Sequence, residues 1–446
     1  MRNKLLFFGT FTLCAVLSLQ PSHATAEPKD ILELYELAKT KDPVVGKAEA
    51  RLEAGKADQD IALSALMPRI SANASQRRFW HKVFNYGPAT IDGSYEGFGY
   101  NIGGQLPIFN IPSYLQISAA DAGQKSAEAG VAAARQDLIV RLADAYIKLL
   151  KAQADEKLYR DELARVSEIL KQAEAFLKAG TGDIIAVYEA RARMDSAAAD
   201  LVKTEAQRQI AEQTLSSLTG IIVTAVKDIQ VGTPIGPQPD NLDWWIETMY
   251  KQNPSIRQAQ EDLAQAGHYS DANRAAHAPT IQFIGGYAVD KGSTFLPEVE
   301  TRQWYIGANV SLPIYSGGET VARTRRAVAG ESERRFMLED SRDQQTRRVK
   351  ESFLNLKYNV SLAEAYQRKY SSTELQLKAT RKGREIGTRT AIDLLNAEQS
   401  YAVSHRDLVG VLYDNLQRSL ELKAAAGILT ESDLALLNSA QVAAVR

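Results

Sequence analysis

Residues 304–318 read WYIGANVSLPIYSGG and mark the change from one kind of secondary structure to another. From Trp304 to Leu312, apolar residues alternate with Tyr, Gly, Asn and Ser, and a period of two is typical of a strand with one apolar face. A proline and two glycines then end the strand. Residues 319–385 contain no proline and have helical spacing, so a very long helix is expected directly after the strand.

The same plan occurs a second time, earlier in the chain. At an offset of 211 residues, the segment 43–70 matches 254–281 without a gap. LPIF at 106–109 then matches LPIY at 312–315, and further on, at an offset of 207, the Gly-Thr pair at 180–181 matches that at 387–388. Because self-similarity over this length indicates a duplicated structural unit, we predict two tandem repeats.

Each repeat is expected to hold a two-strand hairpin followed by a long helical hairpin that turns at a glycine. Residues 82–94 and 291–301, rich in Gly, Pro, Asp and Thr, are predicted to be the hairpin loops. The predicted boundaries are a signal peptide at 1–26; repeat 1 at 27–229, with strands at about 69–80 and 95–109, a long helix at about 113–178 and a return helix at about 183–219; a linker at 230–240; repeat 2 at 241–427, with strands at about 280–290 and 303–315, a long helix at about 319–385 and a return helix at about 390–426; and a C-terminal segment at 428–446.

Helix lengths predict how the helices pack. At 1.5 Å per residue each long helix spans roughly 100 Å. Residues 44–66 and 255–277 have helical spacing and end near a proline. One such incoming helix of about 23 residues and one return helix of about 38 residues together nearly match the long helix in length. Two short helices stacked end to end are therefore expected to run beside one long helix.

Composition and the first residues indicate where the protein works. With 53 basic and 54 acidic residues, binding to nucleic acid through a basic surface is not expected. Arg2, Lys4, an apolar centre and Ala24-Thr25-Ala26 have the pattern of a cleaved secretory signal. The single cysteine, Cys14, leaves with that signal unless it is lipidated, which is the alternative. No later stretch of about 18 apolar residues exists, so only a barrel would cross a membrane.

Four strands are too few to close a barrel. An open sheet edge in lipid would leave backbone groups unpaired, so copies of the chain must supply the missing strands. Two copies would give eight strands filled by side chains, whereas three copies would give twelve strands and a lumen. Trp80, Tyr95, Tyr287 and Trp304 lie near the loop ends of the strands, as in an aromatic girdle. The alternative is a soluble antiparallel sheet that caps a helical bundle.

A search for catalytic or metal-binding patterns finds none. The five histidines do not have metal-ligand spacing, and the chain lacks GxSxG, a phosphate-binding glycine loop and HExxH. We therefore expect neither an enzyme nor a bound cofactor or metal. The basic stretch Arg323, Arg325 and Arg326 is interpreted as a solvated helix face, with lipid phosphate contact as the alternative.

The ordered set of features resembles the TolC family of outer-membrane channels over the whole mature chain. It is most similar at 387–397, GTRTAIDLLNA, and at 429–435, LTESDLA. The resemblance implies a mainly α-helical homotrimer with a twelve-stranded β-barrel in the lipid of the outer membrane and an α-helical barrel in the periplasm. It also implies an exit duct that a periplasmic adaptor joins to an inner-membrane pump of ABC, RND or MFS type. The alternative is a soluble periplasmic coiled-coil spacer or adaptor.

The resemblance also implies which residues form the periplasmic gate. Asp393 occupies the first acidic position of the family's constriction, and Asn396 stands where a second aspartate is often found. Arg389 matches a residue that helps to hold the closed end. The expected partner positions carry Ala186 and Arg384 instead of aspartate and tyrosine, so the closing links must differ, with Asp183 as a possible substitute.

The two Gly-Thr turns are the candidate contacts of the adaptor. The resemblance places adaptor docking near Gly180, Thr181, Gly387 and Thr388. A glycine at a helix end also relieves backbone strain, and that role is expected as well. The cargo stays open between drug, metal and protein, with a weak preference for the branch that serves protein secretion and general efflux.

Overall fold

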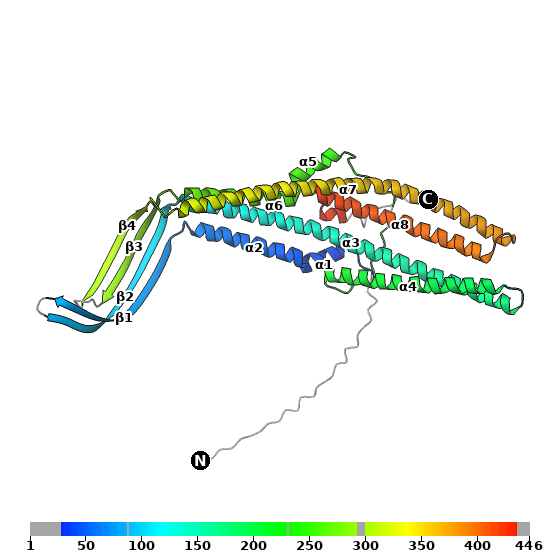
Figure 1. Ribbon diagram of the computed structural model, residues 1–446, viewed down its shortest axis with the longest axis horizontal. Helices are drawn as coiled ribbons and strands as arrows, with labels where there is room; N and C mark the ends of the chain where they lie inside the picture. Colours follow the sequence, from blue (N-terminus) through cyan, green and yellow to red (C-terminus); the bar gives the residue numbers. More distant parts are fainter. Residues whose placement is uncertain (1–27, 87–88, 230–231, 292–298, 435–446) are drawn as a thin grey trace, which may run out of the picture.

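The computed structural model describes residues 28–434 except 87–88, 230–231 and 292–298. It is an elongated molecule with a small antiparallel sheet at one end and long helices that fill the rest (Figure 1). The expected mainly α-helical chain with a small antiparallel sheet is therefore confirmed. The predicted signal peptide and most of the predicted C-terminal segment lie outside the described residues.

One sheet contains the strands of both repeats. Its order is β1 (Arg69–Tyr86), β2 (Ala89–Phe109), β3 (Thr280–Lys291) and β4 (Glu300–Ser311), and all neighbours are antiparallel. The pairing of β2 with β3 joins the hairpin of one repeat to that of the other. Within the chain β1 and β4 are the outer strands of the sheet, each with one partner strand.

The two faces of the sheet differ in polarity. In the register, Ile102 lies opposite Tyr287, and Tyr287 lies opposite Trp304, so these apolar residues share one face. Trp304 is 81% exposed and Ile306, two residues along the same face, is 77% exposed. The other face carries polar residues, among them Asn73, Asn101, Gln105, Gln282, Gln303 and Asn309. Such a large exposed apolar face on a folded protein indicates a non-aqueous environment or a partner.

Two glycines on the polar face make room for a tyrosine. Gly103 and Gly286 lie opposite each other in β2 and β3, and Gly286 lies opposite Tyr305 in β4. A Cβ atom at Gly286 would stand 2.6 Å from the Tyr305 hydroxyl oxygen. The absence of side chains at these two positions therefore lets the tyrosine ring lie flat along the sheet.

The predicted loop of the first hairpin is wrong. Residues 82–86 and 89–94, expected in a loop, continue β1 and β2. β3 pairs with β2 only as far as Phe98, so the first hairpin extends well beyond the second. Glycine and aspartate predicted a loop here, but cross-strand pairing overrides such weak local preferences.

The two Leu-Pro-Ile motifs also end differently. Pro107 is inside β2, opposite Gln282, whereas β4 ends at Ser311, before Pro313. At Pro107 β2 pairs with β3 alone, because its pairing with β1 ends at Gln105, and the register shifts between Pro107 and Phe109, so the proline sits at a one-sided, irregular position that tolerates it. β4 instead stops two residues before Pro313, a residue that cannot donate to the ladder.

The helices stack as their lengths predict. α3 (Ile111–Lys178) and α7 (Glu319–Glu385) run the length of the helical region. Both α2 (Pro43–Ser64) and α4 (Ile184–Thr219) pack against α3, whereas α6 (Pro254–Ala275) and α8 (Ala391–Ala426) pack against α7 (Figure 1). α6 also packs on α3 and thereby holds the two repeats together. Within the described residues, no helix is both long and apolar enough to cross a membrane.

Two short helices were not expected from the sequence. α1 (Ile31–Lys41) and α5 (Leu242–Gln252) precede α2 and α6 in the two repeats. The sequence feature that indicates them is the aspartate or asparagine directly before the first proline of α2 and of α6. Asp42 accepts hydrogen bonds from the backbone N–H groups of the following α2 turn, and Asn253 does the same for α6. A capping residue followed by proline begins a new helix, so the preceding segment is free to form its own.

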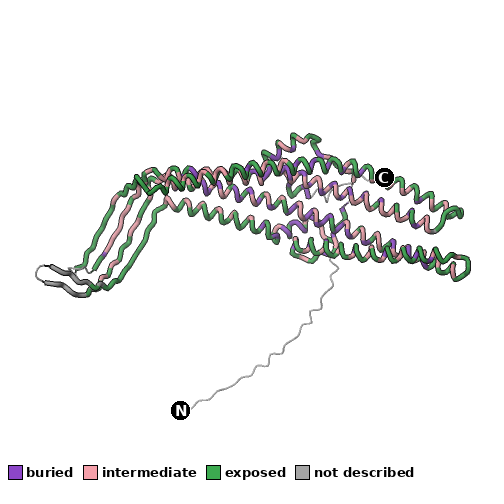
Figure 2. The backbone as a smooth tube through the Cα atoms, in the orientation of Figure 1, coloured by how far each residue is buried: buried purple, intermediate pink, exposed green. Residues whose placement is uncertain are grey.

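The largest apolar core lies midway along the helices, where α1 covers the gap between α2 and α4 (Figure 2). Tyr146 is fully buried there, and its hydroxyl donates to the Lys227 carbonyl at 2.6 Å. Tyr413 and Leu420 of α8 belong to the same core. This core therefore joins the first repeat to the second helical hairpin.

The end of α8 provides a stability test. Gly427 has a φ of +80°, and a Cβ atom there would stand 2.4 Å from the Asn253 Cα atom. Gly387 has a φ of +76° but lies in open space. Gly387→Ala should cost about 1 kcal/mol of backbone strain. Gly427→Ala should cost a further ~1–3 kcal/mol, because the backbone of α6 must shift.

Thermal unfolding followed by circular dichroism checks this. The apparent midpoint should fall several degrees further for Gly427→Ala than for Gly387→Ala. Equal shifts of the midpoint would mean that the close approach of Gly427 to Asn253 does not contribute to the loss of stability.

Candidate gate at the helical tips

Both glycine turns lie at the end of the molecule opposite the sheet (Figure 1). One turn joins α3 to α4 and the other joins α7 to α8. Gly180 and Gly387 have φ values of +74° and +76°, a region that L-residues rarely adopt. The equivalent positions of the two repeats thus make equivalent turns.

The threonines after these glycines complete the turns. The Thr181 backbone N–H donates to the Phe176 carbonyl at 3.0 Å, and its hydroxyl donates to the same oxygen at 3.3 Å. Thr388 donates in the same two ways to the Gly383 carbonyl, at 2.8 and 3.0 Å. These bonds satisfy carbonyls that the helix end leaves without partners. All four Gly-Thr residues are exposed, so a partner protein can reach them.

Asp393 is the third residue of α8 and caps the start of that helix. Its carboxylate accepts from the Thr390 backbone N–H and hydroxyl, both at 2.9 Å, and its own N–H donates to the Thr390 hydroxyl oxygen at 3.1 Å. This reciprocal pair is a capping box. The hydrogen bonds from Thr390, with a smaller contribution from the charge of Arg389, hold the pKa of Asp393 below its usual range. The carboxylate is therefore fixed in place and ionised.

Arg389 and Asn396 flank this carboxylate. Arg389 lies over Gly383, where a Cβ atom would stand 2.7 Å from the arginine Cγ atom. Within the described part of the chain the Arg389 guanidinium makes no ion pair, although its charge helps to lower the pKa of Asp393. Asn396 is exposed one turn after Asp393, on the first turns of α8.

Asp183 has a local role in this structure. It is the N-cap of α4, and its carboxylate accepts from the Ile185 N–H at 3.0 Å. The polar links between the two helical hairpins lie further from the tip, between α3 and α8. They join Arg165 to Glu398, Arg406 to Asp155 and Tyr159, and Lys151 to Asp414. Sequence patterns do not predict these links, because the register of α3 against α8 is set only in the folded chain.

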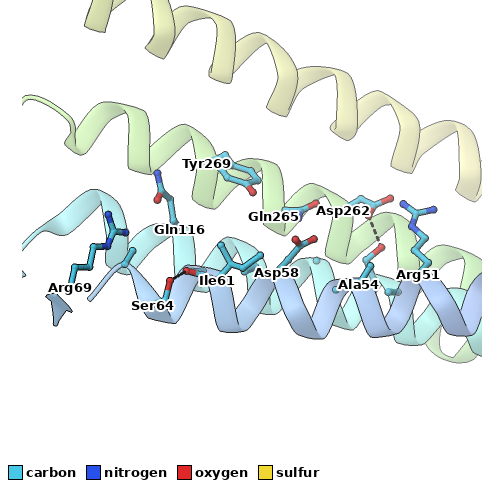
Figure 3. Close-up of a pocket in the computed structure, with 17 residues that line it drawn as sticks. Arg51, Ala54, Asp58, Ile61, Ser64, Arg69, Gln116, Asp262, Gln265 and Tyr269 are labelled. Carbon is cyan, nitrogen blue, oxygen red and sulfur yellow. Dashed lines mark hydrogen bonds between the residues drawn. The ribbon is translucent and has the colours of Figure 1, made fainter. Parts of the chain in front are cut away.

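A second polar site lies near the sheet. A cavity of about 550 Å³ is bounded by α2, α3, α6 and the first residue of β1, and its side chains point into the space between the helices (Figure 3). Its floor is made of small α3 residues, including Ala120 and Gly123. The Ser126 hydroxyl donates to the Asp262 carboxylate at 2.5 Å. The cavity thus mixes acids, arginines and amides.

The described part of the chain contains no group of side chains suited to bind a metal ion. Histidine, cysteine and carboxylate side chains nowhere gather there in threes that could hold an ion. His405 instead lies against the Tyr370 ring, with ring centres 5.4 Å apart. The described site is thus a pair of helical tips with an ionised carboxylate, an exposed arginine and accessible turns.

Comparison with known proteins shows which family has this architecture. The family described as outer membrane efflux protein matches residues 34–221 and 245–428, one match in each repeat. The chain is 25% identical to the outer membrane protein TolC of Vibrio cholerae, over 92% of this chain and 93% of that protein. It is 26% identical to the alkaline protease secretion protein AprF of Pseudomonas aeruginosa, over 91% of this chain and 86% of that protein.

Solved structures agree on the fold. The CmeC outer membrane channel of Campylobacter jejuni superimposes with a TM-score of 0.77 at 19% identity, covering 90% of this chain and 86% of that one. The outer membrane protein VceC of Vibrio cholerae gives 0.76 at 18% identity, covering 89% and 96%. Because the family match covers most of both repeats, the chain belongs to the outer membrane efflux protein family, whose TolC-like members are channels of the outer membrane.

Proposed function

We propose that three copies of this chain form the exit duct of a tripartite efflux or type I secretion system. The observation that carries the proposal is the division of the molecule into an exposed apolar sheet face at one end and exposed helical tips at the other. A duct needs one end that is stable in lipid and one end that a partner can reach. Names of the relatives support this reading over a soluble periplasmic spacer.

The sheet supplies the membrane part of this duct. Its apolar face, with Ile102, Trp304 and Ile306, fits hydrocarbon, and its polar face fits an aqueous lumen. β1 and β4 are the two edges, so β4 of one copy would pair with β1 of the next. Three copies would close twelve strands around a lumen.

Three Asp393 carboxylates would form the selective ring at the periplasmic end. Each is held by Thr390, so the ring would not depend on mobile side chains. Mutual repulsion raises the pKa of clustered carboxylates, and the capping hydrogen bonds oppose that rise. A ring that stays ionised attracts cations and binds divalent ions in a narrow pore. Asn396, one turn further along α8, adds no charge to this ring.

The exposed turns would receive the adaptor. Gly180 and Gly387 hold the chain in tight turns, and the neighbouring threonines direct their hydroxyls back into the helix ends. The docking surface would therefore consist mainly of backbone and of flanking side chains. One of these is the positively charged Arg389. An inner-membrane pump of ABC, RND or MFS type would deliver cargo to the assembled duct.

The cargo proposal remains broad. Relatives named for alkaline protease secretion and for proteases secretion match over more than nine-tenths of this chain. A cation efflux protein matches over a smaller share, 65%. These comparisons support a duct that serves protein secretion and general efflux. We expect no catalytic activity of its own.

Imaging of the detergent-purified particle tests the whole proposal. Helices of about 100 Å and a tilted barrel of roughly 30 Å should give a threefold cylinder about 130–140 Å long. Extraction should require detergent and resist carbonate. A bare helical rod released by carbonate would instead support the soluble spacer.

Asp393→Asn tests the gate. The amide oxygen can still accept from Thr390, but the charge is lost, so divalent-cation block of single-channel conductance should weaken at least about tenfold. Thr390→Val is the matched control, because it removes the hydroxyl of the cap and leaves the carboxylate. Block that is equally strong in Asp393→Asn would remove this residue from the constriction.

Crosslinking tests the adaptor site. The only cysteine is Cys14, so single cysteines can be placed on a clean background. Thr181→Cys and Thr388→Cys should each crosslink to a second periplasmic protein in cells. Val321→Cys, exposed at the sheet end of α7, should not. Equal crosslinking at all three positions would contradict docking at the tips.

A further inference from the structure

Two neighbouring glycines form the floor of a hollow in the apolar face of the sheet. Gly104 of β2 lies opposite Gly285 of β3, at the level of Ile70 in β1 and Ile306 in β4. The hollow has a volume of about 650 Å³. Pockets that bind small ligands have volumes of roughly 300–1,000 Å³. Large apolar and aromatic side chains surround this hollow, namely Ile70, Ile102, Phe283, Tyr287, Trp304 and Ile306.

The fold itself does not require glycine at these two positions. A Cβ atom at Gly104 would stand 3.8 Å from the nearest atom, the Arg69 carbonyl oxygen, and one at Gly285 would stand 3.5 Å from the Tyr305 carbonyl oxygen. Both are ordinary van der Waals distances, unlike the 2.6 Å at Gly286 on the polar face. A glycine inside a strand weakens it and often marks a place where a ligand approaches the backbone. The hollow is therefore open to the surroundings of the sheet.

Charged side chains stand on the same face, further from the helices. We call Lys291, Glu300 and Arg302 the charged border of the sheet. Lys291 lies opposite Glu300 in the register, and Arg302 is two residues further along β4. The Arg302 side chain is 70% exposed, and its Nε–H donates to the Glu300 carboxylate at 2.7 Å. Within the described residues, no acceptor lies on the two Nη atoms of this arginine. The border thus has two positive charges and one negative charge, and it attracts an anion.

Aromatic rings lie between the charged border and the hollow. The ring centres of Tyr287 and Trp304 are 4.5 Å apart, and Tyr100 lies against Tyr287 at 6.3 Å. In membrane proteins such rings lie where lipid headgroups meet hydrocarbon. Four residues of β4, from Arg302 to Ile306, rise about 13 Å, or roughly 10 Å of depth in a strand tilted by about 40°. Half of the hydrocarbon core is about 15 Å thick. An acyl chain that begins near Arg302 would therefore pass the hollow.

We propose that the hollow and the charged border form one site for a membrane lipid with a negatively charged phosphate headgroup. The phosphate binds Arg302 and Lys291, and one acyl chain passes Trp304 and lies in the hollow over Gly104 and Gly285. Guanidinium groups suit phosphate because they donate several N–H groups in one plane. The inference rests on the proposed channel function, which puts this face in lipid. A neighbouring copy of the chain would pair at β1 or β4, beside the hollow, and would not cover it.

Fluorescence quenching by brominated lipids tests the site, because Trp304 lines the hollow. The full chain carries Trp80→Phe, since Trp80 is exposed on the same sheet, and it is reconstituted in phosphatidylcholine vesicles. A small fraction of the lipid has brominated acyl chains and is either phosphatidylglycerol or phosphatidylcholine. Trp244 and Trp245 belong to α5, outside the sheet, and give a constant signal. Brominated phosphatidylglycerol should occupy the site about fivefold more at equal mole fraction, and so quench Trp304 more strongly.

Removal of the positive charges should abolish this preference. In the double variant Arg302→Gln and Lys291→Gln, the two brominated lipids should quench Trp304 equally. Arg77→Gln is the matched control, because Arg77 is exposed at the same end of the sheet but on its polar face. It should keep the preference. An unchanged preference in the double variant would overturn the proposal. Loss of the preference when inorganic phosphate is added at constant ionic strength would also overturn it, since the border would then bind free phosphate.

Filling the hollow should displace the acyl chain. Gly285→Leu should lower the quenching by phosphatidylglycerol to the level given by phosphatidylcholine. Gly307→Leu should not, because Gly307 lies on the polar face of β4, where a Cβ atom would meet nothing within 4 Å. Unchanged quenching in Gly285→Leu would contradict the position of the chain.

The parent protein separates failure of the lipid site from failure of the channel function. Equal quenching of Trp304 by both lipids would overturn the lipid site alone, since the sheet would still lie in the bilayer. If neither lipid quenches Trp304, the sheet does not lie in the bilayer, and the proposed channel function fails together with the site.

Discussion

The whole structure depends on covering two helices of 68 and 67 residues. A helix of this length gains most of its stability where its apolar residues pack against other helices. Neither a helix of 22 residues nor one of 36 can cover it alone, so each long helix takes two partners in succession. The junction between the partners would expose apolar residues to water. α1 and α5 fill these junctions, and Tyr35 and Trp245 are buried there.

This arrangement divides the helical region into parts with different apolar cores. At mid-length, the core around Tyr146 and Tyr413 combines helices from both repeats. Towards the tips each helical hairpin keeps its own small core, and charged side chains bridge the boundary. The shared core at mid-length and the separate cores towards the tips therefore belong to one continuous pattern of helix packing.

The surfaces at the two ends of the molecule differ in polarity. At the sheet, large apolar side chains such as Trp304 are exposed and polar ones share the other face. At the tips, glycine turns and capping side chains satisfy the backbone while little apolar surface is shared between the hairpins. An outer-membrane channel requires both, since one end meets lipid and the other meets water and protein.

The sequence by itself determined the duplication, the long helices, the strand alternation and the two glycine turns, because periodicity and backbone freedom are local properties. Asp393 was singled out by the resemblance and not by spacing, and its capping by Thr390 appeared only in the structure. The sequence did not determine the length of the first hairpin, since pairing between β1 and β2 outweighs the local preference of residues 82–94. Nor did it show the polar links between α3 and α8. Arg165 and Glu398 are more than two hundred residues apart, and only the tertiary register of two long helices brings their charges together.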